Sequence, residues 1–170
     1  GPVPHIHGHN GIGDAQIPAS SQQPLEEDAC DFIIRMAKEY EGKLTLVTLG
    51  RMTNLALALQ KEPELPRLVK NVVFMGGTYH APGNVTPVAE ANIAGDPEAA
   101  DQVLQAGFDI TMVGLDVTQK VRLTAEHIEK LDKYAAPENR PIVDYLKQAM
   151  PLYFRFNRQQ NNCLDHCPVM

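Results

Sequence analysis

Apolar side chains recur at helical spacing over residues 25–41, and Gly42 ends the pattern. The run KLTLVTL at 43–49 follows, and its β-branched and apolar composition predicts a strand. After Gly50, the sequence RMTNLALALQ at 51–60 has the Ala/Leu-rich composition typical of a buried helix. These residues therefore predict a helix, a strand and a second helix in turn.

The alternation continues along the chain. NVVFM at 71–75 is an apolar run that predicts a buried strand, and a helix is expected from Pro97 to about Ala106. FDITMVGLD at 108–116 predicts a further strand. Strands that alternate with helices at this spacing favour a parallel sheet with right-handed crossovers. We therefore expect a doubly wound α/β fold, with a mostly parallel sheet and helices on both faces.

The two ends of the chain are less regular. Residues 1–24 are dense in Gly and Pro and are expected to form a long loop. Thr124 is a good N-cap for a helix that starts at the next residue. A last helical region at about 138–160 contains Pro141 and Pro151, so we expect it to be kinked or broken near them.

Composition narrows the function classes. A chain of 170 residues fits one domain, and a net charge of −6 without a basic cluster argues against a nucleic-acid partner. The apolar runs are too short and too interrupted to cross a bilayer, so no membrane partner is expected. Three cysteines do not form a disulfide framework, which favours a reducing, cytoplasmic location.

The most informative polar residues are Asn84, Glu90 and Asn92, which lie between the strand at 71–75 and a helix start marked by Asp96. An open α/β sheet binds its ligands beyond the carboxyl ends of its strands, where this loop is expected. An amide beside a carboxylate can donate to and accept from the vicinal hydroxyls of a ribose or another polyol. The alternative interpretation is ordinary loop polarity.

Two other clusters could carry chemistry. HIHGHNGIG at 5–13 could present histidines to a metal or supply a proton donor, or it could be a solvated loop. CLDHC at 163–167 has possible metal ligands but lacks the second ligand pair that a zinc site needs. The neighbouring acids Asp28 and Asp31 are expected on the exposed face of the first helix.

Five segments that follow one another in order along the chain resemble the inosine/uridine-preferring nucleoside hydrolases. They are HGHNGIG (7–13), GRMTNLALAL (50–59), VVFMGGTY (72–79), GNVTPVAEANIAGDPEAA (83–100) and ITMVGLDVT (110–118). The resemblance implies hydrolysis of the N-glycosidic bond of a ribonucleoside, which releases ribose and a free base. It also implies a bound calcium ion, to which Thr53 corresponds as a backbone carbonyl ligand. The sequence does not choose between purine and pyrimidine nucleosides.

The resemblance also implies residues that bind the substrate. Asn84, Glu90 and Asn92 correspond to the family's ribose-hydroxyl ligands. His7 corresponds to a histidine in a flexible segment near the nucleoside, and Phe154 falls near an aromatic flap over the base. Relatives of this kind are implied to be homo-oligomers, either dimers or tetramers.

Some family features do not occur in this sequence. The aspartate-rich DxDxxxDD-type motif that supplies most calcium carboxylates and the catalytic base is not found, and Met170 stands where the family has a histidine. An offset alignment would place His166 there instead, and no catalytic residue is assigned. We therefore expect residues 1–170 to be the central part of a single nucleoside hydrolase-like domain. The alternatives are a catalytically inactive ribose or nucleoside binder, or an unrelated α/β sugar-binding or transferase module.

Overall fold

The computed structural model describes residues 3–161 and 166–168, which form two compact units. One unit comprises residues 24–119, and the other combines residues from 3–23 and 120–168. Each unit is described by itself. Whether both belong to a single domain stays a prediction.

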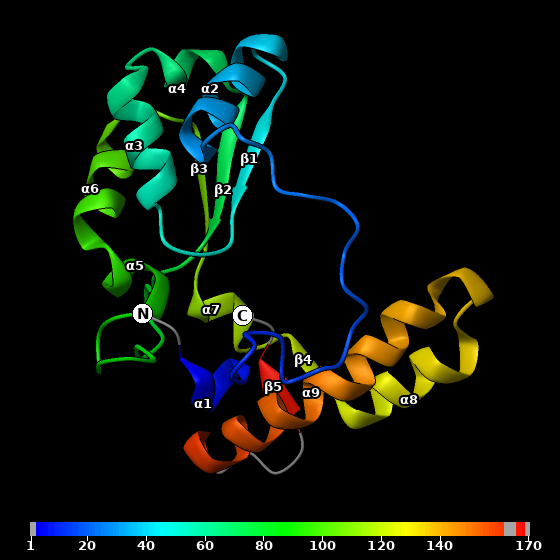
Figure 1. Cartoon of the computed structure of the whole chain (residues 1–170). Helices are drawn as coiled ribbons and strands as arrows, with labels where there is room; N and C mark the ends of the chain where they lie inside the picture. Colours follow the sequence, from blue (N-terminus) through cyan, green and yellow to red (C-terminus); the bar gives the residue numbers. More distant parts are fainter. Residues whose placement is uncertain (1–2, 162–165, 169–170) are drawn as a thin grey trace. The chain divides into compact units, whose positions relative to one another are not determined.

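The unit of residues 24–119 is built on a three-stranded sheet (Figure 1). Its strands are β1 (Thr45–Thr48), β2 (Asn71–Met75) and β3 (Ile110–Val113). All neighbours are parallel and the order is β1-β2-β3, with Val47 opposite Val73 and Val73 opposite Thr111. The predicted parallel α/β sheet is confirmed, and β2 has the predicted bounds. β3 ends earlier than predicted, because Leu115 already belongs to the short helix α7 (Leu115–Thr118).

Further helices accompany the strands of this unit. They are α2 (Ala29–Glu39), α3 (Thr53–Lys61), α4 (Leu65–Leu68), α5 (Ala91–Gly95) and α6 (Pro97–Gln105). Of these, α2, α3 and α6 lie where helices were predicted. Asp96 caps α6 with its side chain, Pro97 is its first residue, and Gly107 follows its end at φ +87°. The start at Asp96 and Pro97 and the end near Ala106 were predicted. The helix α5 was not, because the sequence indicated a loop up to Asp96.

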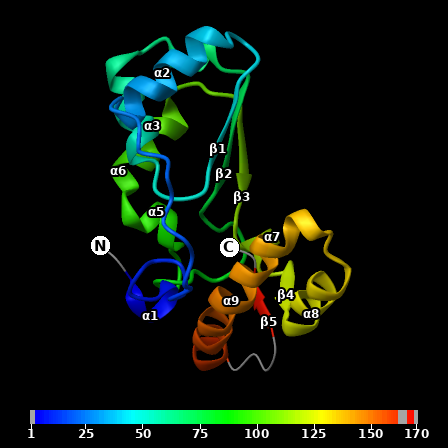
Figure 2. The same cartoon turned by 45° about the vertical axis from the view of Figure 1, so that its right-hand side comes forward.

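The core of this unit lies between the sheet and one helix layer. Val72 and Phe74 of β2 are buried against side chains of α2, α3 and α6. Figure 2 shows α3 and α6 together on one side of the sheet. On the opposite face Val47 is 61% exposed. Helices were predicted on both faces of the sheet. Among the described residues, they cover one face.

The other unit is mainly helical. Its elements are α1 (Pro4–His7), β4 (Arg122–Thr124), α8 (Ala125–Tyr134), the 3₁₀ helix η1 (Pro137–Asn139), α9 (Arg140–Asn161) and β5 (His166–Pro168). β4 pairs with β5 in antiparallel fashion. Thr124 caps α8 as predicted, in a capping box with His127.

The long helix α9 corrects one prediction. It runs through Pro151 as one helix, so a break there is wrong, while the alternative that was predicted with it, a kink, stays a prediction. A proline within a helix removes one backbone hydrogen bond, and the contacts of α9 with α1 and α8 outweigh that loss. Pro141 is the second residue of α9, where the missing N–H has no intrahelical partner to lose. No helix among the described residues has both the length and the apolar character needed to cross a membrane.

Candidate functional site

Glu90 is the most deeply buried member of the predicted polar trio. Its side chain is buried, with the residue only 2% exposed. The carboxylate accepts the N–H groups of Asn92 at 2.9 Å and Ile93 at 3.2 Å, and so caps α5. A side-chain oxygen at this position satisfies N–H groups that the first helical turn leaves unpaired. This cap explains why the chain turns helical directly after Glu90.

The same carboxylate also reaches back to the end of β2. Glu90 Oε2 accepts the N–H of Gly77 at 2.9 Å. A Cβ at Gly76 would lie 3.3 Å from that oxygen, so a glycine allows the close approach. Glu90 therefore joins both ends of the loop between β2 and α5. Three backbone donors hold its charge in a fixed place.

Asn84 and Asn92 lie beside this carboxylate. The Asn84 side-chain oxygen accepts the N–H of Ala91 at 2.9 Å, which places Asn84 against the start of α5. The Asn92 amide donates to the Met75 carbonyl at 3.0 Å, at the carboxyl end of β2. Asn84 is exposed and Asn92 is half-buried. The structure thus brings the three residues together at the predicted edge of the sheet, and their role in binding a sugar stays a prediction.

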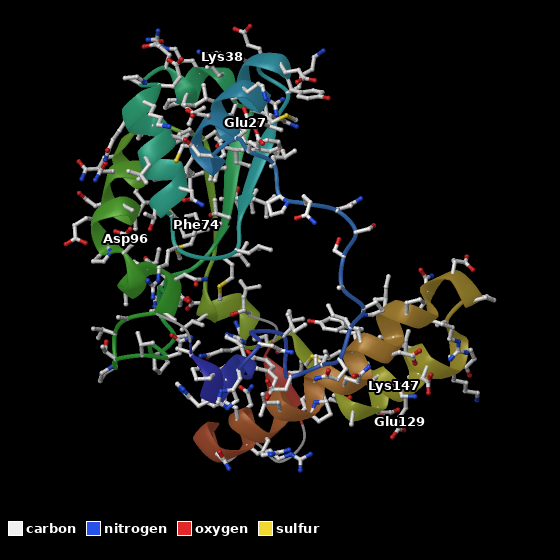
Figure 3. All side chains as sticks on the ribbon, in the orientation of Figure 1. Glu27, Lys38, Phe74, Asp96, Glu129 and Lys147 are labelled. Carbon is white, nitrogen blue, oxygen red and sulfur yellow. The ribbon has the colours of Figure 1, made fainter. Side chains whose placement is uncertain are left out.

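Thr53 connects a second loop to the same region. It is the first residue of α3, and its hydroxyl donates to the Asp96 carboxylate. The Thr53 hydroxyl, and after it the Ala99 N–H at 3.1 Å, hold the pKa of Asp96 below its ordinary value. Figure 3 shows Asp96, the residue that ends α5 and caps α6. Thr53 is therefore tied to the residue that follows α5 directly.

Asp116 is the residue that the sequence interpretation missed. It lies in the first turn of α7, yet its carboxylate accepts the N–H groups of Tyr79, His80 and Ala81 at 2.7, 2.8 and 2.9 Å. These backbone donors keep the pKa of Asp116 well below its ordinary value. The only signal in the sequence is an acid placed directly after a predicted strand, because its partners are backbone groups more than thirty residues earlier.

His7 and Phe154 belong to the other unit. His7 is exposed, and its ring stacks on Tyr153 of α9 with 6.1 Å between the ring centroids. Phe154 lines a cavity of about 450 Å³ formed by α8 and α9. Figure 3 marks Glu129 on α8 and Lys147 on α9, which also line it. Whether either residue joins the trio at the sheet edge stays a prediction.

Glycines and polar side chains order the histidine-rich segment. Asp14 Oδ1 accepts the N–H of His9 at 2.7 Å, and Asn10 Oδ1 accepts the N–H of Ile12 at 3.0 Å. At Gly13, with φ +71°, a Cβ would lie 2.5 Å from the Ala149 carbonyl oxygen of α9. The segment is therefore built as a folded turn against α9.

The predicted metal ligands do not assemble into a site by themselves. Within residues 3–161 and 166–168, no three His, Cys, Asp or Glu side chains group together to hold a metal ion. Calcium takes six to eight oxygen ligands, and the resemblance implies one of them from this part of the chain, the Thr53 carbonyl. Cys163, Asp165 and Met170 lie outside the described residues, as do the side chains of His166 and Cys167. The described residues therefore do not fit calcium on their own.

The chain as a whole is similar to known proteins. The sequence profile of the family described as inosine-uridine preferring nucleoside hydrolase matches residues 2–170. Uridine nucleosidase 1 of Arabidopsis thaliana is 40% identical over 142 residues, which are 84% of this chain and 42% of that protein. The inosine-uridine preferring nucleoside hydrolase of Crithidia fasciculata is 41% identical over 146 residues, which are 83% of this chain and 46% of that protein.

Solved structures show the same similarity. A purine-preferring ribonucleoside hydrolase from Gardnerella vaginalis superposes with a TM-score of 0.88 at 37% identity, over 97% of this chain and 51% of that chain. The chain spans less than half the length of the two curated relatives above.

Proposed function

The chain belongs to the inosine-uridine preferring nucleoside hydrolases, and from this membership we propose that the protein containing it hydrolyses the N-glycosidic bond of ribonucleosides. The products are ribose and a free base. The observation that carries the proposal is the joint position of Asn84, Glu90 and Asn92 at the carboxyl end of β2, where an α/β sheet binds its ligand.

The trio suits the hydroxyl groups of a ribose. Asn84 and Asn92 are the accessible members, and an amide group can both donate to and accept from a hydroxyl. Beneath them, Glu90 Oε2 accepts two N–H groups and Oε1 accepts one, so Oε1 keeps capacity for a further donor. Ribose gains positive charge as the base departs. A carboxylate already held in place stabilises that charge without reorganising during the reaction.

Other roles are proposed from the resemblance. We propose that His7 lies near the nucleoside and that Phe154 belongs to an aromatic flap over the base. We propose calcium for the whole protein, with the Thr53 carbonyl as one ligand among others. The group that takes the proton of the attacking water is not assigned to a residue of this chain.

We also propose a cellular compartment and an oligomeric state for the protein. Three cysteines, of which Cys30 is a buried free thiol, favour a reducing compartment such as the cytoplasm. A dimer or tetramer is proposed from the family resemblance.

A hydrolysis assay on the protein that contains this chain tests the function. Uridine and inosine should each be tested, with free ribose measured as reducing sugar and the free base by chromatography. Asn92→Ala should lower kcat/KM by about a hundredfold, which corresponds to about 2.7 kcal/mol of lost transition-state stabilisation.

Asn139→Ala, at an exposed asparagine in η1, is the matched control and should keep the wild-type rate. An unchanged rate in Asn92→Ala would contradict the proposed role of the trio. Nucleoside binding without any hydrolysis by the wild-type protein would support an inactive binder instead.

A further inference from the structure

The loop that follows β2 is held by the start of α7. The Asp116 carboxylate accepts three consecutive N–H groups, those of Tyr79, His80 and Ala81, at 2.7 to 2.9 Å. The Thr78 hydroxyl lies 3.4 Å from the same carboxylate. An ionised carboxylate binds N–H groups more strongly than a neutral acceptor does. The backbone of residues 79–81 is therefore fixed to α7.

Gly77, two residues before this segment, is held on both sides. The Gly77 carbonyl accepts the N–H of Leu115 at 3.0 Å, and the Gly77 N–H donates to Glu90 at 2.9 Å. Gly77 has φ +72°, and a Cβ at Gly114 would lie 3.0 Å from the Gly77 oxygen. The peptide of Gly77 thus connects the start of α7 to the buried carboxylate of the site.

We propose that Asp116 is a positioning residue of the nucleoside site, which acts by holding the loop of residues 77–81 so that the Gly77 N–H stays on the Glu90 carboxylate. This inference rests on the proposed hydrolase function. Asp116 itself is not a catalytic residue, since its carboxylate is occupied by the backbone of the loop.

Positioning matters at this place because the Gly77 N–H bonds Glu90 Oε2 from outside α5. The carboxylate's two remaining donors, Asn92 and Ile93, belong to α5 and move with Glu90. Gly77 is the donor that ties the carboxylate to the end of β2. A shift of about 1 Å in a group that faces the reacting atoms can lower a rate by about a hundredfold.

Kinetics of Asp116 variants test the inference. Asp116→Ala removes both carboxylate oxygens that accept the N–H groups of the loop. It should lower kcat/KM for uridine by about tenfold or more. Asp116→Asn keeps one acceptor oxygen and should recover part of that loss. Asp28→Ala is the matched control, because Asp28 also accepts two backbone N–H groups but does so at the start of α2. It should lower stability without lowering kcat/KM. An Asp116→Ala rate equal to that of wild type would overturn the inference.

A double-mutant cycle separates positioning from a purely structural role. If Asp116 acts through Glu90, then Glu90→Gln combined with Asp116→Ala should be no slower than Glu90→Gln alone. If the fold-losses in kcat/KM of the two single variants multiplied in the double variant, the inference would be overturned, because Asp116 would then act independently of Glu90. Urea unfolding of each variant confirms that the assays compare folded proteins.

Amide hydrogen exchange distinguishes failure of this inference from failure of the proposed function. The N–H of Gly77 should exchange faster in Asp116→Ala than in the wild-type protein, and equally slowly in Asp28→Ala. If the wild-type protein hydrolysed no nucleoside, the proposed function would fail, while faster exchange at Gly77 would still support control of Glu90 by Asp116. Unchanged exchange at Gly77 would overturn that control whether or not the protein is active.

Discussion

Three carboxylates in and around the proposed site are held by hydrogen-bond donors of the chain. Glu90, Asp96 and Asp116 each accept N–H groups from loops or helix starts. The first of these carries the charge of the proposed site, and the other two fix the chain around it. The hydrogen bonds of Asp96 and Asp116 thus support the proposed chemical role of Glu90.

The pKa shifts of Asp96 and Asp116 predict how stability depends on pH. Both pKa values lie below the ordinary value of 3.8, because hydrogen bonds favour the ionised form in the folded protein. A carboxyl group whose pKa falls on folding binds fewer protons folded than unfolded. Its contribution is therefore complete above about pH 4 and is lost as the pH falls through the lower pKa of the folded state.

We accordingly expect the urea midpoint to stay level from neutral pH to about pH 5 and to fall below about pH 4. Asp96→Asn should keep the α6 cap, because asparagine caps well, but should show a shallower fall in acid. Asp101→Asn, at an exposed acid on the same helix, should follow the wild-type curve. A midpoint that rises as the pH drops below about 4 would contradict the assigned shifts.

Individual site residues differ in how far the sequence could reveal them. Asn84, Glu90 and Asn92 could be placed at the sheet edge because a strand precedes them and a helix cap follows. The burial of Glu90 could not be predicted, since it depends on the Gly77 N–H across the loop. Asp116 was missed for the same reason: a carboxylate that binds a distant backbone leaves no local pattern.

At the scale of elements, capping residues predicted helix starts better than proline predicted helix ends. Asp96 and Thr124 both cap the helices that the sequence assigned to them. The five-residue helix α5 has no apolar period to reveal it, and the Glu90 side chain caps its N-terminus. Pro151 was expected to interrupt α9, but tertiary contacts along the helix decide the outcome.

The sheet provides a matched pair of substitutions at this scale. Val72 and Val47 lie on adjacent strands and on opposite faces, and they are 0% and 61% exposed. Val72→Thr places a hydroxyl in the core without a partner and should lower the free energy of unfolding by about 1–3 kcal/mol. Val47→Thr keeps a β-branched side chain in solvent and should change the free energy of unfolding by less than about 0.5 kcal/mol.

Urea unfolding of the two variants of the 170-residue chain measures this difference. The shape and volume of the side chain are the same in both substitutions, so burial is the variable that differs. Equal losses for Val47→Thr and Val72→Thr would show that the outer face of β1 is covered in solution.

At the scale of the whole molecule, the alternation of strands and helices was enough to predict the parallel sheet. Each of β1, β2 and β3 is an apolar run followed by a helix, which is a repeated and local signal. The pairing of β4 with β5 joins three-residue strands about forty positions apart, and such short strands show no readable period. The division into two units likewise follows from long-range contacts that the sequence pattern does not record.

The chain that connects α1 to α2 passes from one unit to the other and should be the first site of proteolysis. Residues 16–26 are all exposed, and no backbone–backbone hydrogen bond joins residues 16–27 among the described residues. A protease needs a segment that can extend into its active site, and such exposed, weakly bonded segments are preferred. Ile17 and Leu25 are 54% and 67% exposed.

Thermolysin, which cleaves before large apolar residues, should therefore cut first at Leu25, because Pro18 directly after Ile17 hinders cleavage there. Val88 is also exposed, but its loop is held by backbone bonds from Val85 and Thr86 to the Ala89 carbonyl and should resist longer. Mass spectrometry of the first products identifies the cut. Replacing Ile17 and Leu25 together by serine should slow that cut without moving the urea midpoint, because neither side chain is buried. A first cut within β1, β2 or β3 would instead show that the sheet opens more readily than the connection, contrary to the exposure of residues 16–26.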